Sequence, residues 1–271
     1  MIRTWLKSLL GALGFEAVRR SEDPVLRELL AAYRELRLAP GDALRWEDRL
    51  PQPASMSHLR NLLAGQAIDL VLDVGANVGQ FAGLVRRLGY AGDILSFEPG
   101  SAARARLRSA AAGDARWQVR AEAIGRVRGS TRLDIRADSS FSSTLSNNEA
   151  GRRRFGSLVD VVASETVEVV PLDSLLGEFS GRDRRILLKT DTQGNDLDVL
   201  AGAGETLGSC RAVLSEAAAI PIYEGAPRLE ELTRAMERAG FSLSGLFPTG
   251  HQPWPGLALI ELDCYFVRDL G

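Results

Sequence analysis

The sequence predicts an α/β fold built around a parallel sheet, and three apolar runs indicate it. The first, Leu70–Val74, leads through a glycine-containing turn into a helical pattern. The second, residues 93–97, ends at the acid Glu98, and the third, residues 185–190, ends at Asp191 and turns through a glycine into another helical pattern. Because ligands of such folds bind outside the carboxyl ends of the strands, we expect the functional site there.

Bulk composition is that of a soluble globular protein. The 271 residues suffice for one α/β domain and a modest extension, with 45% hydrophobic and 25% charged residues. A net charge of −2 gives no electrostatic reason to expect nucleic acid as a partner. No apolar run approaches the roughly 18 residues of a membrane span. Cys210 and Cys264 lie in apolar runs and are expected to be buried free thiols, so we predict a cytoplasmic protein.

Residues 1–60 are predicted to form a helical extension, and residues 61–271 the main domain. Apolar residues at helical spacing over the first 13 positions favour a helix packed on the domain or on a partner subunit. The alternative is peripheral membrane contact through residues 1–20. A second helix is expected from Pro24 to about residue 38, followed by a linker at Pro51–Pro53 and a short helix over residues 58–63.

The turn after the first strand suits a ligand without a pyrophosphate. A dinucleotide site favours the spacing G-x-G-x-x-G, whereas Gly75 and Gly79 here enclose three other residues, Asn77 among them. Asp73 would repel a phosphate and attract an ammonium group. A ligand with an amino-acid end and a ribose fits better, and S-adenosylmethionine has that make-up. We therefore expect Asp73, Gly75, Asn77 and Gly79 to bind it, and a nicotinamide dehydrogenase is disfavoured.

Glu98 is the expected ribose ligand. It follows Asp73 by 25 residues, near the spacing at which an acid at the end of the second strand binds ribose hydroxyls. A carboxylate can accept from both vicinal hydroxyls. Capping of the helix that begins near Ser101 is the alternative, but the strand-end context favours ribose binding, with Pro99 beside it.

A third strand, residues 117–123, is expected to bring Ala123 and Ile124 to the same edge, where they would flank the adenine. Residues 131–136 and 166–170 alternate like strands and are predicted to pair around an insert.

The insert carries two further features. Its hydroxyl-rich stretch, residues 139–145, is the candidate for a mobile lid over the site. The run Arg152–Arg154 would suit an anionic substrate, although such runs are more often a solvated surface.

Several motifs occur in a recognisable order along residues 68–268. They are Val71–Gly79, Phe97–Pro99, Ala123–Gly125, Ser139–Leu145, Leu172-Asp173, Leu188–Gly194 and Asp263–Arg268. Together they resemble the FkbM family of S-adenosylmethionine-dependent methyltransferases. The resemblance implies a class I methyltransferase fold, a Rossmann-like seven-stranded mixed sheet with an antiparallel last strand. It also implies O-methylation, often of sugar hydroxyls in glycans, polysaccharides or natural products. Family members often carry an aromatic or small residue and then glutamate where this chain has Asn195-Asp196, so the role of Asp196 is open.

Methyl transfer to a hydroxyl needs a group that aligns the acceptor and takes its proton. Asp191, at the end of the fourth strand, is the first candidate. His251 lies in the expected loop 248–253 and is either a second candidate or an exposed loop residue. Glu216 ends a fifth strand, residues 213–216, and is a third. Lys189 is more readily explained as an ion-pair partner.

Two alternatives to this mechanism stay open. Asp191 and Glu216 could hold Mg²⁺, since hard cations prefer carboxylates, although Glu216 could equally form a salt bridge or a cap. No resident metal is predicted. The domain could also be a non-catalytic S-adenosylmethionine-binding or scaffold module, but the intact site residues argue against that. The expected acceptor is a sugar or another small molecule.

Overall fold

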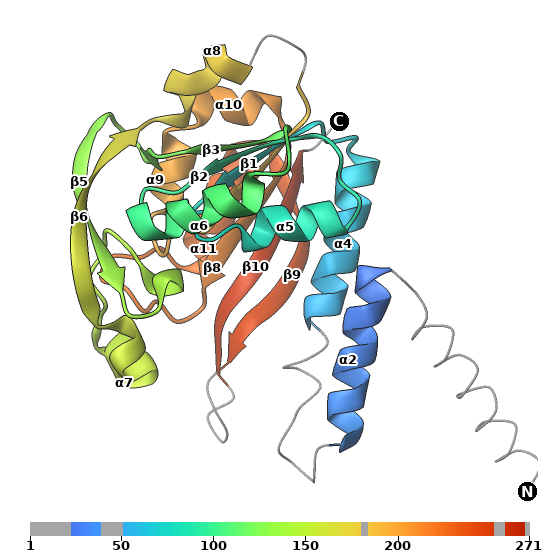
Figure 1. Cartoon of the computed structure of the whole chain (residues 1–271), viewed down its shortest axis with the longest axis horizontal. Helices are drawn as coiled ribbons and strands as arrows, with labels where there is room; N and C mark the ends of the chain where they lie inside the picture. Colours follow the sequence, from blue (N-terminus) through green and yellow to red (C-terminus); the bar gives the residue numbers. More distant parts are fainter. Residues whose placement is uncertain (1–22, 39–50, 180–183, 252–257, 269–271) are drawn as a thin grey trace, which may run out of the picture.

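The computed structural model describes residues 23–38, 51–179, 184–251 and 258–268, which form a sheet covered by helices (Figure 1). Helix α2 (Pro24–Leu38) precedes the domain, and Asp23 caps it by accepting from the backbone N–H of Val25 at 2.8 Å. The predicted helix and membrane contact within residues 1–20 lie outside the described residues. Within the described ranges, no helix is long and apolar enough to cross a membrane.

Helix α4 (Pro51–Gly65) corrects the predicted linker at Pro51–Pro53. Proline suits the first helical turn, where backbone N–H groups lack helical partners, so the two prolines begin the helix instead of preventing it. The helix continues through residue 60, where the extension was predicted to end, and it packs beside the last strand pair. Its buried residues are Pro53, Ser55, Met56, Leu59, Leu62 and Leu63.

The main sheet has seven strands in the order β3-β2-β1-β7-β8-β10-β9. Their bounds are β1 (Leu70–Val74), β2 (Asp93–Phe97), β3 (Trp117–Arg120), β7 (Ile186–Thr190), β8 (Cys210–Ala218), β9 (Phe241–His251) and β10 (Leu259–Arg268). Strand β10 runs antiparallel to both neighbours, which confirms the predicted mixed sheet of the class I methyltransferase type. Strand order reverses between β1 and β7, whose last residues Val74 and Thr190 are paired. The loops after these two strands are therefore neighbours.

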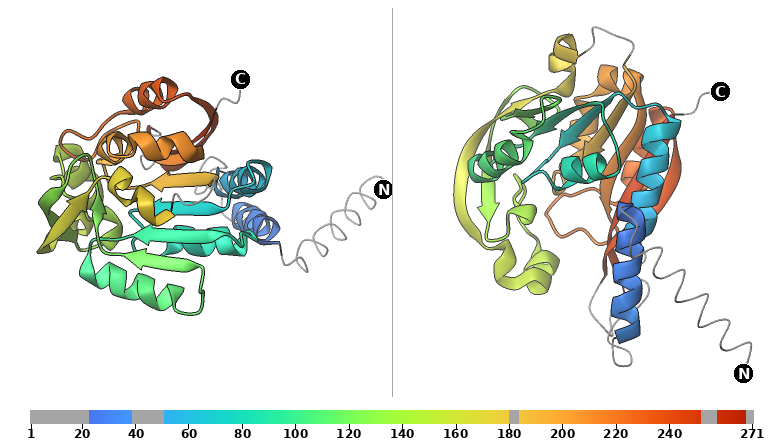
Figure 2. Two further views of the ribbon diagram at one scale, coloured as in Figure 1. Left: turned by 90° about the horizontal axis from the view of Figure 1, so that it is seen from above. Right: turned by 45° about the vertical axis from the view of Figure 1, so that its right-hand side comes forward.

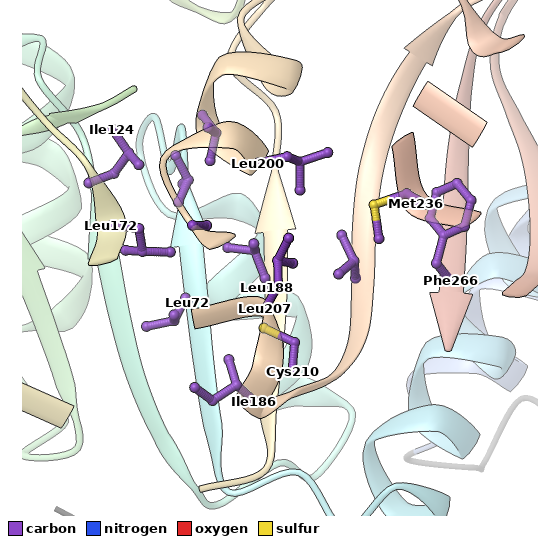
Figure 3. Packing of buried hydrophobic residues seen from close by; sticks show 14 of the residues in the cluster. Leu72, Ile124, Leu172, Ile186, Leu188, Leu200, Leu207, Cys210, Met236 and Phe266 are labelled. Atoms are coloured by element: carbon purple, nitrogen blue, oxygen red, sulfur yellow. The ribbon is translucent and has the colours of Figure 1, made fainter. Parts of the chain in front are cut away.

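Helices cover both faces of the sheet (Figure 2). One face carries α9 (Asp196–Ala201), α10 (Gly204–Ser209) and α11 (Leu229–Arg238), and the other carries α4, α5 (Gln80–Arg87) and α6 (Ser101–Ala111). Successive strand residues alternate between the two cores: Leu72 packs with Leu200, whereas Val71 packs with Leu59. Burial on both faces explains why the central strands are mainly apolar, and Figure 3 shows the packing in one of the two cores. Cys210 and Cys264 are buried and free, as predicted.

A second sheet of three strands, in the order β4-β6-β5, stands beside the first. Strands β5 (Gly129–Arg136) and β6 (Val161–Val170) are antiparallel, which confirms the predicted pairing around the insert. The predicted third strand was too long. Strand β3 ends at Arg120, and residues 123–124 form β4, which pairs with β6. Arg120 and Glu122 form an ion pair of 2.6 Å at this point, where polar residues end the edge strand and the chain crosses over.

The remaining short elements lie mainly within or beside the insert. They are the 3₁₀ turns Ser139–Phe141, Gly156–Val159 and Leu172–Leu175, and the helices α7 (Glu149–Phe155) and α8 (Leu176–Phe179).

Candidate functional site

A cavity of about 870 Å³ lies at the carboxyl ends of β1, β2 and β7. Two of its walls differ in chemistry. The glycine-loop wall consists of Gly75, Asn77, Glu98, Pro99 and Ile124; the acidic wall consists of Asp191, Glu216, Glu261 and Asp263. The cavity is large enough for a nucleoside-sized ligand together with a second small molecule.

The glycine loop is a tight turn that only a residue without a side chain can begin. Gly75 has a φ of 74°, and a Cβ there would lie 1.9 Å from the carbonyl oxygen of Asp191. Gly79 has a φ of 95°, and its Cβ would lie 3.0 Å from side-chain atoms of Leu107 and Trp117. Gly75 therefore presents bare backbone to the cavity. Gly79, which was predicted to bind the ligand, does not line the cavity and instead allows the loop to pack closely on α6 and β3.

Glu98 is held at the cavity by two backbone donors. Asn77 N–H donates to its Oε2 at 2.9 Å, and Gly100 N–H donates to its Oε1 at 2.7 Å. Each carboxylate oxygen keeps a further lone pair for a ligand hydroxyl. Burial raises the pKa of Glu98, and the two backbone hydrogen bonds oppose that effect. Gly100 is the N-cap of α6, so Glu98 both accepts a hydrogen bond at the start of this helix and lines the cavity.

Asp73 lies beneath the loop, completely buried, with an ammonium partner inside the protein. Its Oδ1 is 3.2 Å from Lys189 Nζ, and its Oδ2 accepts from Ser96 Oγ at 3.1 Å. Lys189 also donates to the carbonyl of Gly75 at 2.9 Å. Burial disfavours the charged lysine, but Asp73 and Asp191 outweigh it, so the pKa of Lys189 lies above its usual range. The predicted ion-pair role of Lys189 is confirmed, and the pair supports the loop from below.

Asp191 and Glu216, expected at neighbouring strand ends, are joined by one side chain. Gln193 Nε2 donates to Asp191 Oδ1 at 2.9 Å and to Glu216 Oε2 at 3.1 Å. The Asp191 side chain is 38% exposed, so it is accessible from the cavity. Burial and then the negative charge of Asp191 raise the pKa of Glu216 well above its usual range.

The acidic wall continues on one face of β10. Asp263 is paired in register with Glu216, and opposite residues of an antiparallel pair share a face of the sheet. Residues 261, 263 and 265 are spaced two apart and so share one face of β10, and Glu261, Asp263 and Tyr265 line the cavity together. Burial, together with the charge of Asp191, raises the pKa of Glu261 to about 7 and that of Asp263 to about 6.

Helix α4 completes the cavity beside this face, a contribution that the sequence interpretation missed. Its residues Pro51, Gln52, Ser55 and Met56 line the cavity. The hydroxyls of Ser55 and Tyr265 lie 2.8 Å apart. The predicted linker concealed this contribution, since a linker gives no reason to expect a wall.

The hydroxyl-rich segment 139–145 reaches both loops, as expected of a segment over the site. Ser139 Oγ donates to Asn77 Oδ1 at 3.0 Å, on the glycine loop. Ser143 Oγ donates to the carbonyl of Gln193 at 2.9 Å, and Thr144 Oγ1 donates to Asn195 Oδ1 at 3.1 Å. The segment thus bridges the loops after β1 and β7; its predicted mobility stays a prediction.

Other predicted residues fall in several places. Ala123 and Ile124 line the cavity from β4. His251 ends β9, opposite Leu259, so residues 248–251 belong to a strand and not to the predicted loop; its side chain lies outside the described part of the chain. Asp196 is buried and accepts from Thr192 N–H at 3.3 Å, which closes the turn after β7. Within the described ranges, no group of three His, Cys, Asp or Glu side chains is arranged to hold a metal ion.

Four residues that were not among the predicted site residues contribute to the site: Gln193, Tyr223, Glu261 and Asp263. Gln193 lies within the quoted motif Leu188–Gly194, which was the signal available for it. Glu261 and Asp263 alternate with apolar residues in the last strand, a pattern that indicates one polar face. Tyr223 contacts the site from an irregular segment, and no pattern marks it.

Comparison with known proteins gives one family and a set of structural likenesses. The model of the methyltransferase FkbM domain matches residues 73–243. No curated protein matches the chain.

Three solved structures represent the likenesses. Magnesium protoporphyrin IX methyltransferase from Synechocystis, with bound S-adenosylmethionine, is 12% identical, with 92% of this chain and 98% of that one covered and a TM-score of 0.43. Aeropyrum pernix fibrillarin, with natively bound S-adenosylmethionine, is 13% identical, with 79% of this chain and 74% of that one covered and a TM-score of 0.44. Burkholderia thailandensis 1,6-didemethyltoxoflavin-N1-methyltransferase, with bound S-adenosylhomocysteine, is 12% identical. The match covers 90% of this chain and 88% of that one, with a TM-score of 0.42.

Proposed function

The chain belongs to the FkbM methyltransferase domain family, and we propose that it is an S-adenosylmethionine-dependent O-methyltransferase. The proposed acceptor is a hydroxyl group of a sugar, a glycan or a natural product. The observation that carries the proposal is the single cavity in which the glycine-loop wall meets the acidic wall. One wall suits a nucleoside with an amino-acid end, and the other suits the removal of a proton.

The glycine-loop wall fits the cofactor. The bare turn at Gly75 leaves space that a Cβ would fill. Glu98 is fixed by two backbone donors and retains acceptor capacity for two ribose hydroxyls. Ile124 and Ala123 offer an apolar contact for the adenine. Asp73 supports the loop through Lys189.

When bound, S-adenosylmethionine supplies a methyl group on a positively charged sulfur, which leaves as a neutral thioether when the acceptor oxygen forms its bond to the methyl carbon. Asp191 would orient the acceptor hydroxyl and take its proton, because its carboxylate is accessible and its backbone adjoins the glycine loop. Glu216, tied to it through Gln193, would keep a second carboxylate nearby. The surrounding walls would exclude water from the acceptor oxygen.

Calorimetry with S-adenosylmethionine and S-adenosylhomocysteine is the first test. We expect binding of both, and failure of both to bind would contradict the proposal. A panel of methyl glycosides and matching amino sugars then tests the acceptor, with release of S-adenosylhomocysteine as the readout. Transfer to hydroxyl groups is expected. Transfer to amino groups alone would contradict O-methylation, and cofactor binding without transfer to any natural acceptor would favour the scaffold alternative.

The magnesium alternative has its own test. In the structure the Gln193 amide donates to both carboxylates that would hold the ion. We expect turnover to be unchanged after exhaustive EDTA treatment. Loss of turnover on chelation and recovery with Mg²⁺ would favour a metal held by Asp191 and Glu216.

A further inference from the structure

Gln193 occupies an unusual place between two acids. One nitrogen, Nε2, donates to Asp191 Oδ1 at 2.9 Å and to Glu216 Oε2 at 3.1 Å. An amide nitrogen carries two hydrogens, so each carboxylate receives one. Two carboxylates at such close range repel each other, and a shared pair of donors offsets part of that repulsion. The Lys189 ammonium, 3.6 Å from Asp191 Oδ2, offsets it from the other side.

The amide is itself held in one orientation. The Tyr223 hydroxyl lies 2.8 Å from Gln193 Oε1 and 3.0 Å from the carbonyl oxygen of Phe141, and its one hydrogen can be donated to either acceptor. Donation to Oε1, the shorter contact, leaves Nε2 facing the acids. Tyr223 is only 3% exposed, so this contact lies inside the protein. With the oxygen facing Tyr223 and the nitrogen facing two acceptors, the reversed amide would place an oxygen against two carboxylates. The observed orientation is therefore the favourable one.

The backbone of Gln193 is constrained as well. Its φ is 54°, a left-handed conformation that residues other than glycine rarely adopt. Its carbonyl accepts from Ser143 Oγ at 2.9 Å, so the insert segment holds the backbone while the side chain holds the acids. Such a conformation persists where the surroundings over-determine it, and functional sites are common places for it.

We propose that Gln193 is a positioning residue that holds the Asp191 and Glu216 carboxylates together at the point where the methyl group is transferred. It touches neither cofactor nor acceptor in this role. The inference rests on the proposed function, because it assumes that the methyl group of the cofactor points toward Asp191.

A cofactor analogue provides a test that needs no acceptor. Sinefungin carries an ammonium-bearing carbon where S-adenosylmethionine carries its methylated sulfur, so its cation should lie against the two carboxylates. S-adenosylhomocysteine lacks that cation. The ratio of the two affinities, measured by calorimetry, therefore reports whether the carboxylates are in place.

In the wild-type protein we expect sinefungin to bind more tightly than S-adenosylhomocysteine. Gln193→Leu should reduce that advantage about 5- to 10-fold, because the two carboxylates lose the hydrogen bonds from Gln193 Nε2 that hold them beside the cation. The affinity for S-adenosylhomocysteine should change less than about 2-fold. Tyr223→Phe leaves Gln193 Nε2 in place but removes the partner of Oε1, and we expect a smaller reduction in the same direction. Gln118→Leu, the same substitution at an exposed position of β3, is the matched control and should leave the ratio unchanged.

The outcomes separate the inference from the proposed function. An unchanged or increased sinefungin advantage in both Gln193→Leu and Tyr223→Phe would overturn the positioning role. Asp191→Asn should remove most of the advantage. If it does not, the methyl group does not face Asp191, and the proposed catalytic arrangement fails. Should Gln193→Leu not fold, Tyr223→Phe alone decides the positioning role.

Discussion

The two walls of the cavity satisfy their polar groups in opposite ways. On the glycine-loop wall, Glu98 receives two backbone hydrogen bonds, and Asp73 beneath it pairs with Lys189. On the acidic wall, burial and mutual repulsion raise the pKa values of Glu216, Glu261 and Asp263. The first wall is complete before any ligand arrives. The second carries carboxylates for which a ligand with hydroxyl or ammonium donors would be a favourable partner.

This difference indicates that cofactor binding would depend on the glycine-loop wall and acceptor binding and proton removal on the acidic wall. A preformed backbone cradle suits a ligand that is the same in every turnover. A wall on which the pKa of Glu261 is raised to about 7 and that of Asp263 to about 6 suits proton removal and an uncharged or cationic acceptor. Substitutions on the two walls should therefore affect different measured quantities, and the following variants test that separation.

Asp191→Asn should have the largest effect on turnover. The amide keeps the shape of the side chain but cannot take a proton, so we expect kcat to fall about 10²- to 10⁴-fold. Affinity for S-adenosylhomocysteine, which lacks the transferred methyl group, should change less than about 3-fold. Steady-state kinetics and calorimetry measure the two quantities. Wild-type kcat would remove Asp191 from the mechanism.

Gly75→Ala should break the separation, because this residue touches both walls. The added Cβ would lie 1.9 Å from the Asp191 carbonyl, and φ is 74°. We expect at least about a 30-fold loss of S-adenosylhomocysteine affinity, since the loop must move. Gly113→Ala, where a Cβ meets nothing within 4 Å, is the control. Unchanged affinity in Gly75→Ala would place the cofactor elsewhere.

Glu98→Ala should act on the glycine-loop wall alone. Loss of hydrogen bonds from ribose hydroxyls to a charged group is expected to weaken S-adenosylhomocysteine binding about 10- to 100-fold. Adenine-containing ligands without a ribose should be affected far less, which separates ribose recognition from general damage to the loop. Equal losses for both kinds of ligand would indicate that Glu98 serves only as a cap for α6.

Glu261→Gln should act on the acidic wall alone and have the smallest effect. The folded-state pKa of Glu261, about 7, lies above its ordinary value of 4.5. A raised carboxyl pKa stabilises the fold fully at pH below the ordinary value, and that stabilisation is lost as the pH rises through 7. The variant should therefore raise Tm by about 2–4 °C at pH 8 and change it little at pH 4.5. Glu230→Gln, at an exposed position of α11, is the control for thermal melts at both pH values.

The glycine-loop wall and the fold could be predicted because local chemistry dictates them. Apolar strands, glycines with positive φ and an acid at a strand end are properties of short stretches. They located Gly75, Asn77 and Glu98 at the cavity. The pairing of β5 with β6 followed from alternation alone. Asp73 was predicted to bind the ligand, but it is completely buried, pairs with Lys189 and does not line the cavity. Because Lys189 lies more than a hundred residues away in the chain, this burial could not be foreseen.

The acidic wall could be predicted only in part because it is assembled by tertiary contacts. Asp191 and Glu216 were identified as strand-end acids, but the amide that joins them was not. Only the second half of α4 was predicted, as a short helix over residues 58–63, and its first turn was predicted as a linker, although proline suits a first helical turn. Strand register places Asp263 opposite Glu216, and register depends on pairing that no single segment encodes.

The position of β10 within the sheet has a consequence for how the protein is made. Strand β10 follows β9 in the chain yet lies between β8 and β9. A ribosome therefore delivers the glycine loop long before the strand that carries Glu261 and Asp263. Because β9 and β10 pair with each other, we expect them to form a hairpin that joins the edge of β8 as a unit. During synthesis, the nascent chain would acquire a place for the cofactor first and the acids of β10 only with this final docking step.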